Sequence, residues 1–352
     1  MALVPRTDAR TIEIEKQYPN LYVFLNAFRD AFGVREAPSI ILRRSGVSET
    51  FRTVDAVASF RDMVSISTVT LNRALELQYP RGHRPTWANT FWIYPWMTDK
   101  NNKYLVAQTP GFLGIHETSE FRGQSAPEIP SLKVRNTEID AILLAALVKR
   151  WQRRFATKRP AWADRALFRS LNMAHQAALM PAGADATIHD FGRSIALWVS
   201  ALEILIHPRT SAVRLSDVCD LLERVDWQSP TLRARRHKAF KSKPPRRHNL
   251  ASWLCAKLYM ARHDFLHGNP ISERRMMVKA SNLPINRFAA PVYRLALSAF
   301  LNLRWSKPMP SLERPAELGR RVAERMEFYG PQSNAERALL RAVSPPADAG
   351  DD

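Results

Sequence analysis

The sequence predicts a mainly α-helical protein in which a helical bundle follows a smaller, mixed α/β N-terminal domain. From residue 138 onward, apolar residues recur at helical spacing in one segment after another. Before that point, several short aromatic-rich segments are bounded by glycine and proline, as strands often are. Between the two regions, residues 123–135 combine two prolines with small polar residues, which is typical of a linker. We therefore expect domains at 1–135 and 138–305, with a last helix and a frayed tail in 306–352.

Residues 1–135 are expected to contain both helices and strands. Helical apolar spacing occurs in residues 21–28 and 54–77. The predicted strands are the short, turn-bounded segments 91–96, 104–108 and 112–115. Nothing in these residues indicates the role of the domain.

The predicted bundle is a series of amphipathic helices. They are expected at 138–158, 160–181, 187–207, 212–226, 249–268 and 284–305, with one more at 313–328 in the tail. The third of these is nearly apolar after Ile195, so it should lie at the centre of the bundle. Glu203 is conspicuous as the one acid in that apolar run. The fifth stops at Gly268, a residue favoured just past a helix end.

Composition narrows the class of protein. The hydrophobic content of 45% is enough for a packed core. No apolar run is long enough to span a membrane, and the acids near the N-terminus argue against a secretory signal. The two cysteines, Cys219 and Cys255, form no metal-ligand pair, so we expect no disulfide framework and no zinc ribbon. The sequence therefore predicts a cytoplasmic protein without a cofactor or a membrane contact.

The charge indicates a polyanionic partner. Lysine and arginine total 52 against 33 acids, a formal net charge of +19, and nucleic acid is the commonest polyanion. The excess is greatest in residues 229–250, here called the basic segment, which contains no acid. Its basic residues are Arg233, Arg235, Arg236, Lys238, Lys241, Lys243, Arg246 and Arg247. Pro244 and Pro245 make it a loop, which is either a solvated connector or a phosphate-binding loop.

One motif carries chemistry. The fifth predicted helix ends in KLYMARHDFLHG, in which Arg262 and His267 are separated by four residues. The third helix, ALWVSALEILIHP, precedes it with an Ala-Leu-Glu core. Together these segments resemble the HEPN superfamily, and within it the Apea-like group, whose hallmark is an arginine, four to six residues and a histidine. The resemblance covers residues 138–305 and not the N-terminal third.

The resemblance implies an endoribonuclease that needs no metal. In that chemistry the ribose 2′-OH attacks the adjacent phosphorus, leaving 2′,3′-cyclic phosphate and 5′-hydroxyl ends. A histidine can transfer protons near neutral pH, and an arginine fork suits the crowded phosphorane. The expected catalytic residues are Arg262, His267 and the intervening His263, with Glu203 and Asp264 in support. On a regular helix, residues five apart point about 140° away from each other, so a loosened last turn or a second copy is needed. The resemblance implies a homodimer with a composite site.

Each of these residues also has a structural interpretation. Arg262 can form a salt bridge with Glu203 or Asp264 and only brace the bundle. His267 can be a cap that complements the helix dipole. His263 and His267 are four apart and can bind a metal, although no third ligand is obvious. Glu203 can orient Arg262 or can be a buried structural acid.

Other functions stay open beside the ribonuclease. A HEPN module that does not cleave can bind RNA or a protein partner, and the basic segment alone would suit a DNA-binding protein. Phosphate-loop, His-Glu-x2-His and Gly-x-Ser-x-Gly motifs are absent. By family analogy the setting is bacterial defence or a toxin system, with a separate regulatory or antitoxin protein. The tryptophans at 87, 92 and 96 can stack on bases or pack in the protein.

Overall fold

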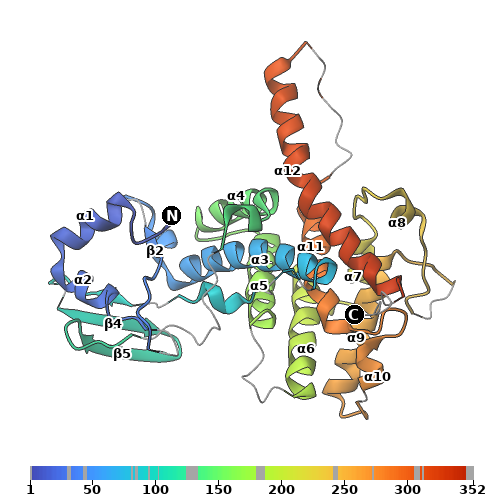
Figure 1. The fold of residues 1–352 in the computed structure, drawn as a ribbon, viewed down its shortest axis with the longest axis horizontal. Coiled ribbons are helices and arrows are strands. Elements are labelled where there is room, and N and C mark those ends of the chain that lie inside the picture. The colour runs from blue at the N-terminus through green and yellow to red at the C-terminus, as the bar shows by residue number, and fades with distance from the viewer. Residues whose placement is uncertain are drawn as a thin grey trace. The chain divides into compact units, whose positions relative to one another are not determined.

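The computed structural model confirms a mainly α-helical fold with small sheets (Figure 1). It describes residues 2–29, 33–42, 46–80, 82–83, 86–93, 96–101, 103–123, 134–179, 187–240, 245–271, 273–304, 310 and 313–345. The chain forms two compact units. The first comprises Met1–Arg61 and Asn89–Lys133, and the second comprises Asp62–Ala88 and Val134–Asp352.

The first unit combines two short helices with two small antiparallel sheets. Along the chain, strand β1 (Ala2–Val4) is followed by helices α1 (Ala9–Gln17) and α2 (Pro19–Leu25) and then by strand β2 (Ile40–Leu42). Strands β1 and β2 pair with each other. A second sheet has the order β3-β4-β5, formed by Met97–Thr98, Tyr104–Thr109 and Phe112–Glu117. The predicted strands at 104–108 and 112–115 are thus confirmed.

The predicted strand at 91–96 is wrong. Residues Ala88–Phe91 form a 3₁₀ helix instead, and residues 94–95 lie outside the described part of the chain. Pairing begins only at Met97, opposite Val106. The aromatic content of this segment therefore reflects packing and not strand pairing.

The core of the first unit is aromatic. Phe24 and Phe28 pack edge to face at 5.2 Å, and Leu105 of β4 lies buried in the same cluster. Trp96 packs against this cluster and contacts the ring of Phe121 at 5.4 Å. Packing is therefore the observed role of Trp96.

The second unit is a helical bundle. Its helices are α4 (Ala141–Phe155), α5 (Trp162–Ala177), α6 (Ile188–Leu205), α7 (Leu215–Leu222), α8 (Pro230–Ala234), α9 (Leu250–Leu266), α10 (Glu273–Met276), α11 (Ala289–Phe300) and α12 (Pro315–Leu340). A short hairpin, β6 (Met277–Val278) and β7 (Leu283–Pro284), precedes α11. Helix α6 packs against α5, α7, α9 and α11, as its nearly apolar sequence predicts.

The division of the chain differs from the expected ranges. Helix α3 (Val54–Gln78) begins in the first unit, but from Asp62 onward it belongs to the bundle. Its small polar residues are buried there: the Ser67 carbonyl accepts the N–H of Asp140 at 3.0 Å, and Asn72 Nδ2 donates to the Glu138 carbonyl at 3.0 Å. Residues 62–88 therefore do not belong to an N-terminal domain ending at 135.

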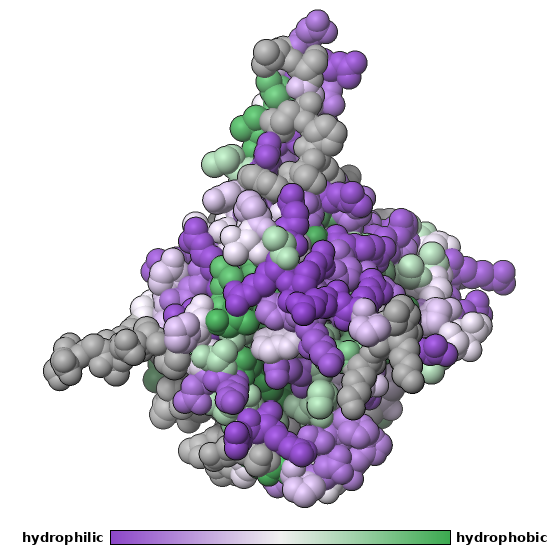
Figure 2. Space-filling view, turned by 90° about the vertical axis from the view of Figure 1, so that its right-hand side faces the viewer, coloured by the Kyte–Doolittle hydropathy of each residue, from purple (hydrophilic) through white to green (hydrophobic). Residues whose placement is uncertain are grey.

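Helix α12 extends beyond its predicted end at 328. Residues 315–327 are mostly exposed and project from the bundle (Figure 1). Some apolar side chains are visible along this projecting part (Figure 2). From Phe328 onward the helix packs into the bundle and buries Ala335 and Leu339. The expected frayed tail therefore does not include residues 329–345, whereas 346–352 lie outside the described residues.

A buried polar network fastens this second half of α12. Arg294 of α11 donates to Asp140 at 3.0 Å and to Gln332 of α12. Gln332 donates to Glu336 at 2.9 Å, and Glu336 accepts the N–H of Gln228 at 2.8 Å. The Arg294 charge is paired with the Asp140 carboxylate, and a buried charge costs less free energy when it is paired and hydrogen-bonded.

Candidate functional site

Helix α9, which contains Arg262 and His263 and has His267 as its C-cap, is buried in its first half and exposed near its end. The Asn249 side chain caps its start by accepting the N–H of Ser252 at 2.9 Å. Its first half is almost entirely buried, including Leu254, Cys255 and Leu258. Burial raises the pKa of the Cys255 thiol well above its ordinary value, so this cysteine is no nucleophile. The reactive groups of α9 therefore lie in its second half.

The end of α9 confirms the predicted stop. The N–H of His267 donates to the His263 carbonyl at 3.1 Å, and the N–H of Asn269 donates to the Asp264 carbonyl at 3.0 Å. Between them Gly268 has a φ of +67°, a left-handed conformation that glycine adopts without strain. This is a Schellman ending, with His267 itself as the C-cap. His267 thus lies where the regular helix has ended.

Arg262 is held by Glu203 of α6. Its Nη1 donates to Glu203 Oε1 at 3.3 Å, and its guanidinium carbon lies 5.6 Å from the ring centre of Tyr259. The side chains are 24% and 19% exposed, so the pair is only partly shielded from water. Burial raises the pKa of the Glu203 carboxyl, and the Arg262 charge opposes that rise. Arg262 Nε is buried and has no hydrogen-bond partner among the residues described.

Asp264 has a different partner. It accepts hydrogen bonds from Arg275 Nη1 at 3.0 Å and from Asn269 Nδ2 at 3.1 Å. It therefore fastens the turn after α9 and forms no pair with Arg262. Sequence reasoning missed Asn269 and Arg275, although Asn269 directly follows the glycine at which the helix stops.

The structure brings His263 and His267 together. Both side chains are exposed, and their ring centres lie 4.3 Å apart. In the described part of the chain, no hydrogen bond or ring contact joins Arg262 to His267, as expected from their five-residue spacing. The described residues also contain no cluster of three or more side chains that could hold a metal ion. The two imidazoles form the centre of the candidate site.

A close helix contact positions this last turn. The ring of Phe265 lies against Gly192 of α6, where a Cβ atom would be 2.6 Å from Phe265 Cε2. The ring of His189 lies 6.2 Å from Phe265. Because no side chain separates α6 from Phe265, the absence of a Cβ at position 192 determines how closely the end of α9 approaches α6. Neither residue was singled out from the sequence.

The basic segment is not a simple loop. It starts with the short helix α8. An antiparallel bridge joins the backbones of His237 and His248 through two hydrogen bonds, with N···O distances of 2.7 and 2.8 Å. Lys241 and Lys243 lie outside the described residues. The expected loop is thus pinned at its base.

Acidic residues in α7 and directly after it form salt bridges with some of the arginines of the basic segment. The pairs are Arg236–Glu223 at 2.6 Å, Arg246–Asp220 at 2.7 Å and Arg233–Asp226 at 3.9 Å. Within the described residues, Arg235, Lys238 and Arg247 have no acid partner. The surrounding face is covered mainly by hydrophilic side chains (Figure 2). The sequence signal for this pairing was the three-residue spacing of the acids, which sequence reasoning overlooked.

Comparison with family models, curated proteins and solved structures found no match to this chain. The resemblance to the HEPN superfamily therefore rests on the motif and its helical setting. In the described residues, no helix has the length and apolar content needed to span a membrane.

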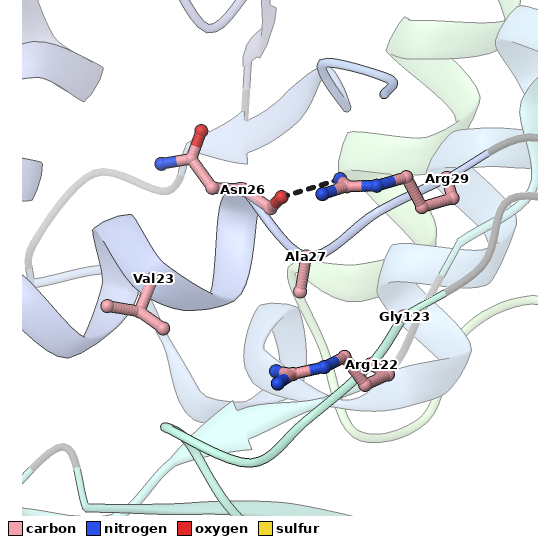
Figure 3. Close-up of a pocket in the computed structure, with 6 residues that line it drawn as sticks. All are labelled: Val23, Asn26, Ala27, Arg29, Arg122 and Gly123. Carbon is pink, nitrogen blue, oxygen red and sulfur yellow. Dashed lines mark hydrogen bonds between the residues drawn. The ribbon is translucent and has the colours of Figure 1, made fainter. Parts of the chain in front are cut away.

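A pocket of about 350 Å³ lies in the first unit (Figure 3). Arg29 and Arg122 line it, and Arg29 Nη1 donates to the Asn26 carbonyl at 2.8 Å. None of its lining residues is an acid or a histidine. The pocket therefore offers positive charge and no group for acid–base catalysis.

Proposed function

We propose that the protein is an endoribonuclease that cleaves RNA without a metal. The observation that carries this proposal is the pair of exposed imidazoles, His263 and His267, at the end of α9, the helix that also carries Arg262. Histidine is the side chain best suited to exchange protons near neutral pH. Two adjacent imidazoles supply one proton acceptor and one proton donor, as phosphodiester cleavage by internal attack requires.

The reaction balances with these groups alone. One imidazole takes the proton of the ribose 2′-OH while the 2′-oxygen forms a bond to the adjacent phosphorus. The bond from phosphorus to the 5′-oxygen breaks, and the other imidazole, which we assign to His267, protonates that oxygen. The products are a 2′,3′-cyclic phosphate and a 5′-hydroxyl end.

Arg262 would stabilise the negative charge of the phosphorane. In the described part of the chain its one hydrogen bond runs from Nη1 to Glu203, which leaves Nη2 unpaired on a side chain that is 24% exposed, and a guanidinium fork fits phosphate oxygens. Glu203 would orient this arginine. Asp264 would act indirectly, by holding the turn that carries His267.

We infer that the active form is a homodimer in which the ends of α9 face one another. Arg262 and His267 point in different directions on one helix, so a second copy would complete each site. Met260 and Leu266 beside the histidines are 63% and 54% exposed, which gives this face apolar area to bury. An isologous contact would place the same patch on both copies.

Incubation of the purified protein with RNA in EDTA tests the proposal. We expect cleavage with cyclic phosphate ends, no cleavage of a 2′-deoxy substrate, and a loss of about 10²–10⁴ in rate for His267→Ala. His116→Ala is the matched control, because this exposed histidine lies in β5 of the first unit, outside the motif and the bundle. Cleavage of 2′-deoxy RNA, or 5′-phosphate products, would contradict the mechanism.

A second candidate is a HEPN-type module that binds RNA or a protein partner without cleaving. It is favoured by the existing ion pairs of Arg262, Arg236 and Arg246, which use part of their charge within the protein. Binding of RNA by wild type without any cleavage, together with a lowered melting temperature in His267→Ala, would support it. By the same resemblance, a separate regulatory or antitoxin protein would be a partner in either case.

A further inference from the structure

On one face of the three-stranded sheet of the first unit, apolar side chains are exposed in the described part of the chain. Paired residues of an antiparallel sheet point to the same face, so Met97, Val106 and Ile115 form one row across the three strands. Leu113 follows in the next row, opposite Gln108. Met97, Ile115 and Leu113 are 57%, 61% and 67% exposed. The opposite face packs on the aromatic core through Leu105.

Among the described strands, none pairs with the outer edge of β5. Strand β3 has only two residues, and a short edge strand offers little to pair with. Strand β5 has six residues, and among the described strands it pairs with β4 alone. Its sequence, FLGIHE, has neither lysine nor arginine nor proline, in a chain whose net charge is +19. Edge strands normally carry such residues to prevent pairing with other chains.

We propose that β5 pairs antiparallel with β5 of a second copy, around a two-fold axis at Gly114. This pairing places Leu113 of each copy opposite Ile115 of the other, on the exposed face. Phe112 then lies opposite the second copy's His116 on the other face. The result is a six-stranded sheet whose apolar rows continue from one copy into the next.

The sequence of β5 is self-complementary in this register. Glu117, its one charged residue, falls opposite Gly111 of the turn, so like charges do not meet. A shift by two residues in one direction would place Leu113 against Glu117. A shift in the other direction would place Ile115 against Gly111 and leave one apolar pair, Leu113 against Leu113, in place of two Leu113–Ile115 pairs. Cross-strand apolar pairs stabilise a sheet, whereas like charges in that position destabilise it.

A six-residue strand pair is small compared with a standard interface of about 800 Å² per partner, so the association should be weak. It lies in the first unit and includes no residue of the α9 motif. It is therefore independent of the proposed ribonuclease dimer. A measurement that captures a weak contact is needed.

Cysteine cross-linking of the full chain tests the register. Residues directly opposite in such a pair have Cβ atoms about 4.5–5.5 Å apart, and diagonal neighbours are about 7–8 Å apart. A mixture of Leu113→Cys and Ile115→Cys proteins should therefore form a disulfide-linked dimer under mild oxidation, and either protein alone should form little. Cys219 and Cys255 are buried and should not interfere. Equal cross-linking in the single proteins and the mixture, or none in the mixture, would overturn the proposal.

Charge at the edge provides a second test. With Met260 and Leu266 also changed to lysine to remove the proposed α9 contact, Leu113→Lys with Ile115→Lys should raise the apparent dissociation constant measured by sedimentation at least about tenfold, equivalent to about 1.4 kcal/mol. Gln108→Lys is the matched control, because this exposed residue lies across from Leu113 but away from the edge. Association that the double variant leaves unchanged would also overturn the proposal. RNA cleavage should persist when the same β5 changes or Gln108→Lys are made with Met260 and Leu266 intact, so a failure of the ribonuclease proposal would be recognised separately.

Discussion

Two arginines of the second unit have opposite surroundings. Arg294 is 1% exposed, and each of its three guanidinium nitrogens has an oxygen neighbour on Asp140 or Gln332. Arg262 is 24% exposed and makes one hydrogen bond, at 3.3 Å, to Glu203. In the first arrangement, hydrogen bonds from Nε and Nη1 join α11 to the N-cap residue of α4 and to α12. The surroundings of Arg262 leave N–H donors unpaired on a partly exposed side chain, and such donors can form hydrogen bonds to a phosphate.

The comparison predicts a large difference in stability. Arg294→Ala would leave the buried carboxylate of Asp140 without its counter-charge, which should lower the free energy of unfolding by about 3–5 kcal/mol. Arg262→Ala removes a partly exposed pair and should cost no more than about 1 kcal/mol. Urea unfolding of the two variants provides the measurement. Similar losses in both would mean that Arg262 is as structural as Arg294.

Activity should show the reverse order. Arg262→Ala should lower the cleavage rate by about 10²–10³, because it removes the group proposed to stabilise the phosphorane. Arg262→Lys keeps the charge but loses the planar fork, so it should recover only part of the rate. Single-turnover cleavage of a short RNA would measure both. Full activity in Arg262→Ala would remove the arginine from the mechanism.

The same contrast recurs in the basic segment. Arg235, Lys238 and Arg247 have no acid partner in the described chain, whereas Arg236 and Arg246 pair with Glu223 and Asp220. Changing the first three residues to glutamine should flatten the salt dependence of RNA binding by about one slope unit per lost contact. Changing Arg236 and Arg246 should flatten it less. Equal slopes in all variants and wild type would identify the segment as a connector.

The smallest effect concerns the pH dependence of stability. Burial raises the pKa of Glu203 above its ordinary value of 4.5, so the folded protein binds more protons than the unfolded chain just above that pH. Stability contributed by this group therefore falls as the pH rises through that range. Arg262→Ala removes the opposing charge, so its destabilisation should be greater at about pH 7 than at about pH 4. Melting curves at both pH values would check this.

Glu203→Gln is the control for that measurement. Since glutamine does not titrate, Arg262→Ala made in this background should lose the same stability at both pH values. A pH-dependent difference that persists in the double variant would have to come from another group.

Local patterns in the sequence were enough to predict much of the bundle. Helical spacing located helices α4 to α7 and α9, but not α8, and Gly268 located the end of α9, because both signals depend on neighbouring residues. Long-range contacts could not be predicted in the same way. The pairing of Arg236 with Glu223, the contact of Phe265 with Gly192 and the membership of α3 in the bundle all join segments distant in sequence.

The site was predicted in part for the same reason. Glu203 attracted attention as an acid in an apolar run, and the structure places it against Arg262. Asp264 was grouped with Arg262 by proximity in sequence, but its helical position directs it to Arg275 instead. The His263–His267 contact follows from their four-residue spacing, which puts both on one face of a helix.

The contact between Gly192 and Phe265 restricts variation at a position that carries no chemistry. Any side chain at 192 would act as a spacer between α6 and the end of α9, and it would displace the histidines without altering either of them. Two chains with the same Arg262 and His267 motif could therefore differ in the position of their histidines if they differed at residue 192. A search for functional relatives that compares only Arg262 and His267 would overlook the residue that determines where those groups stand.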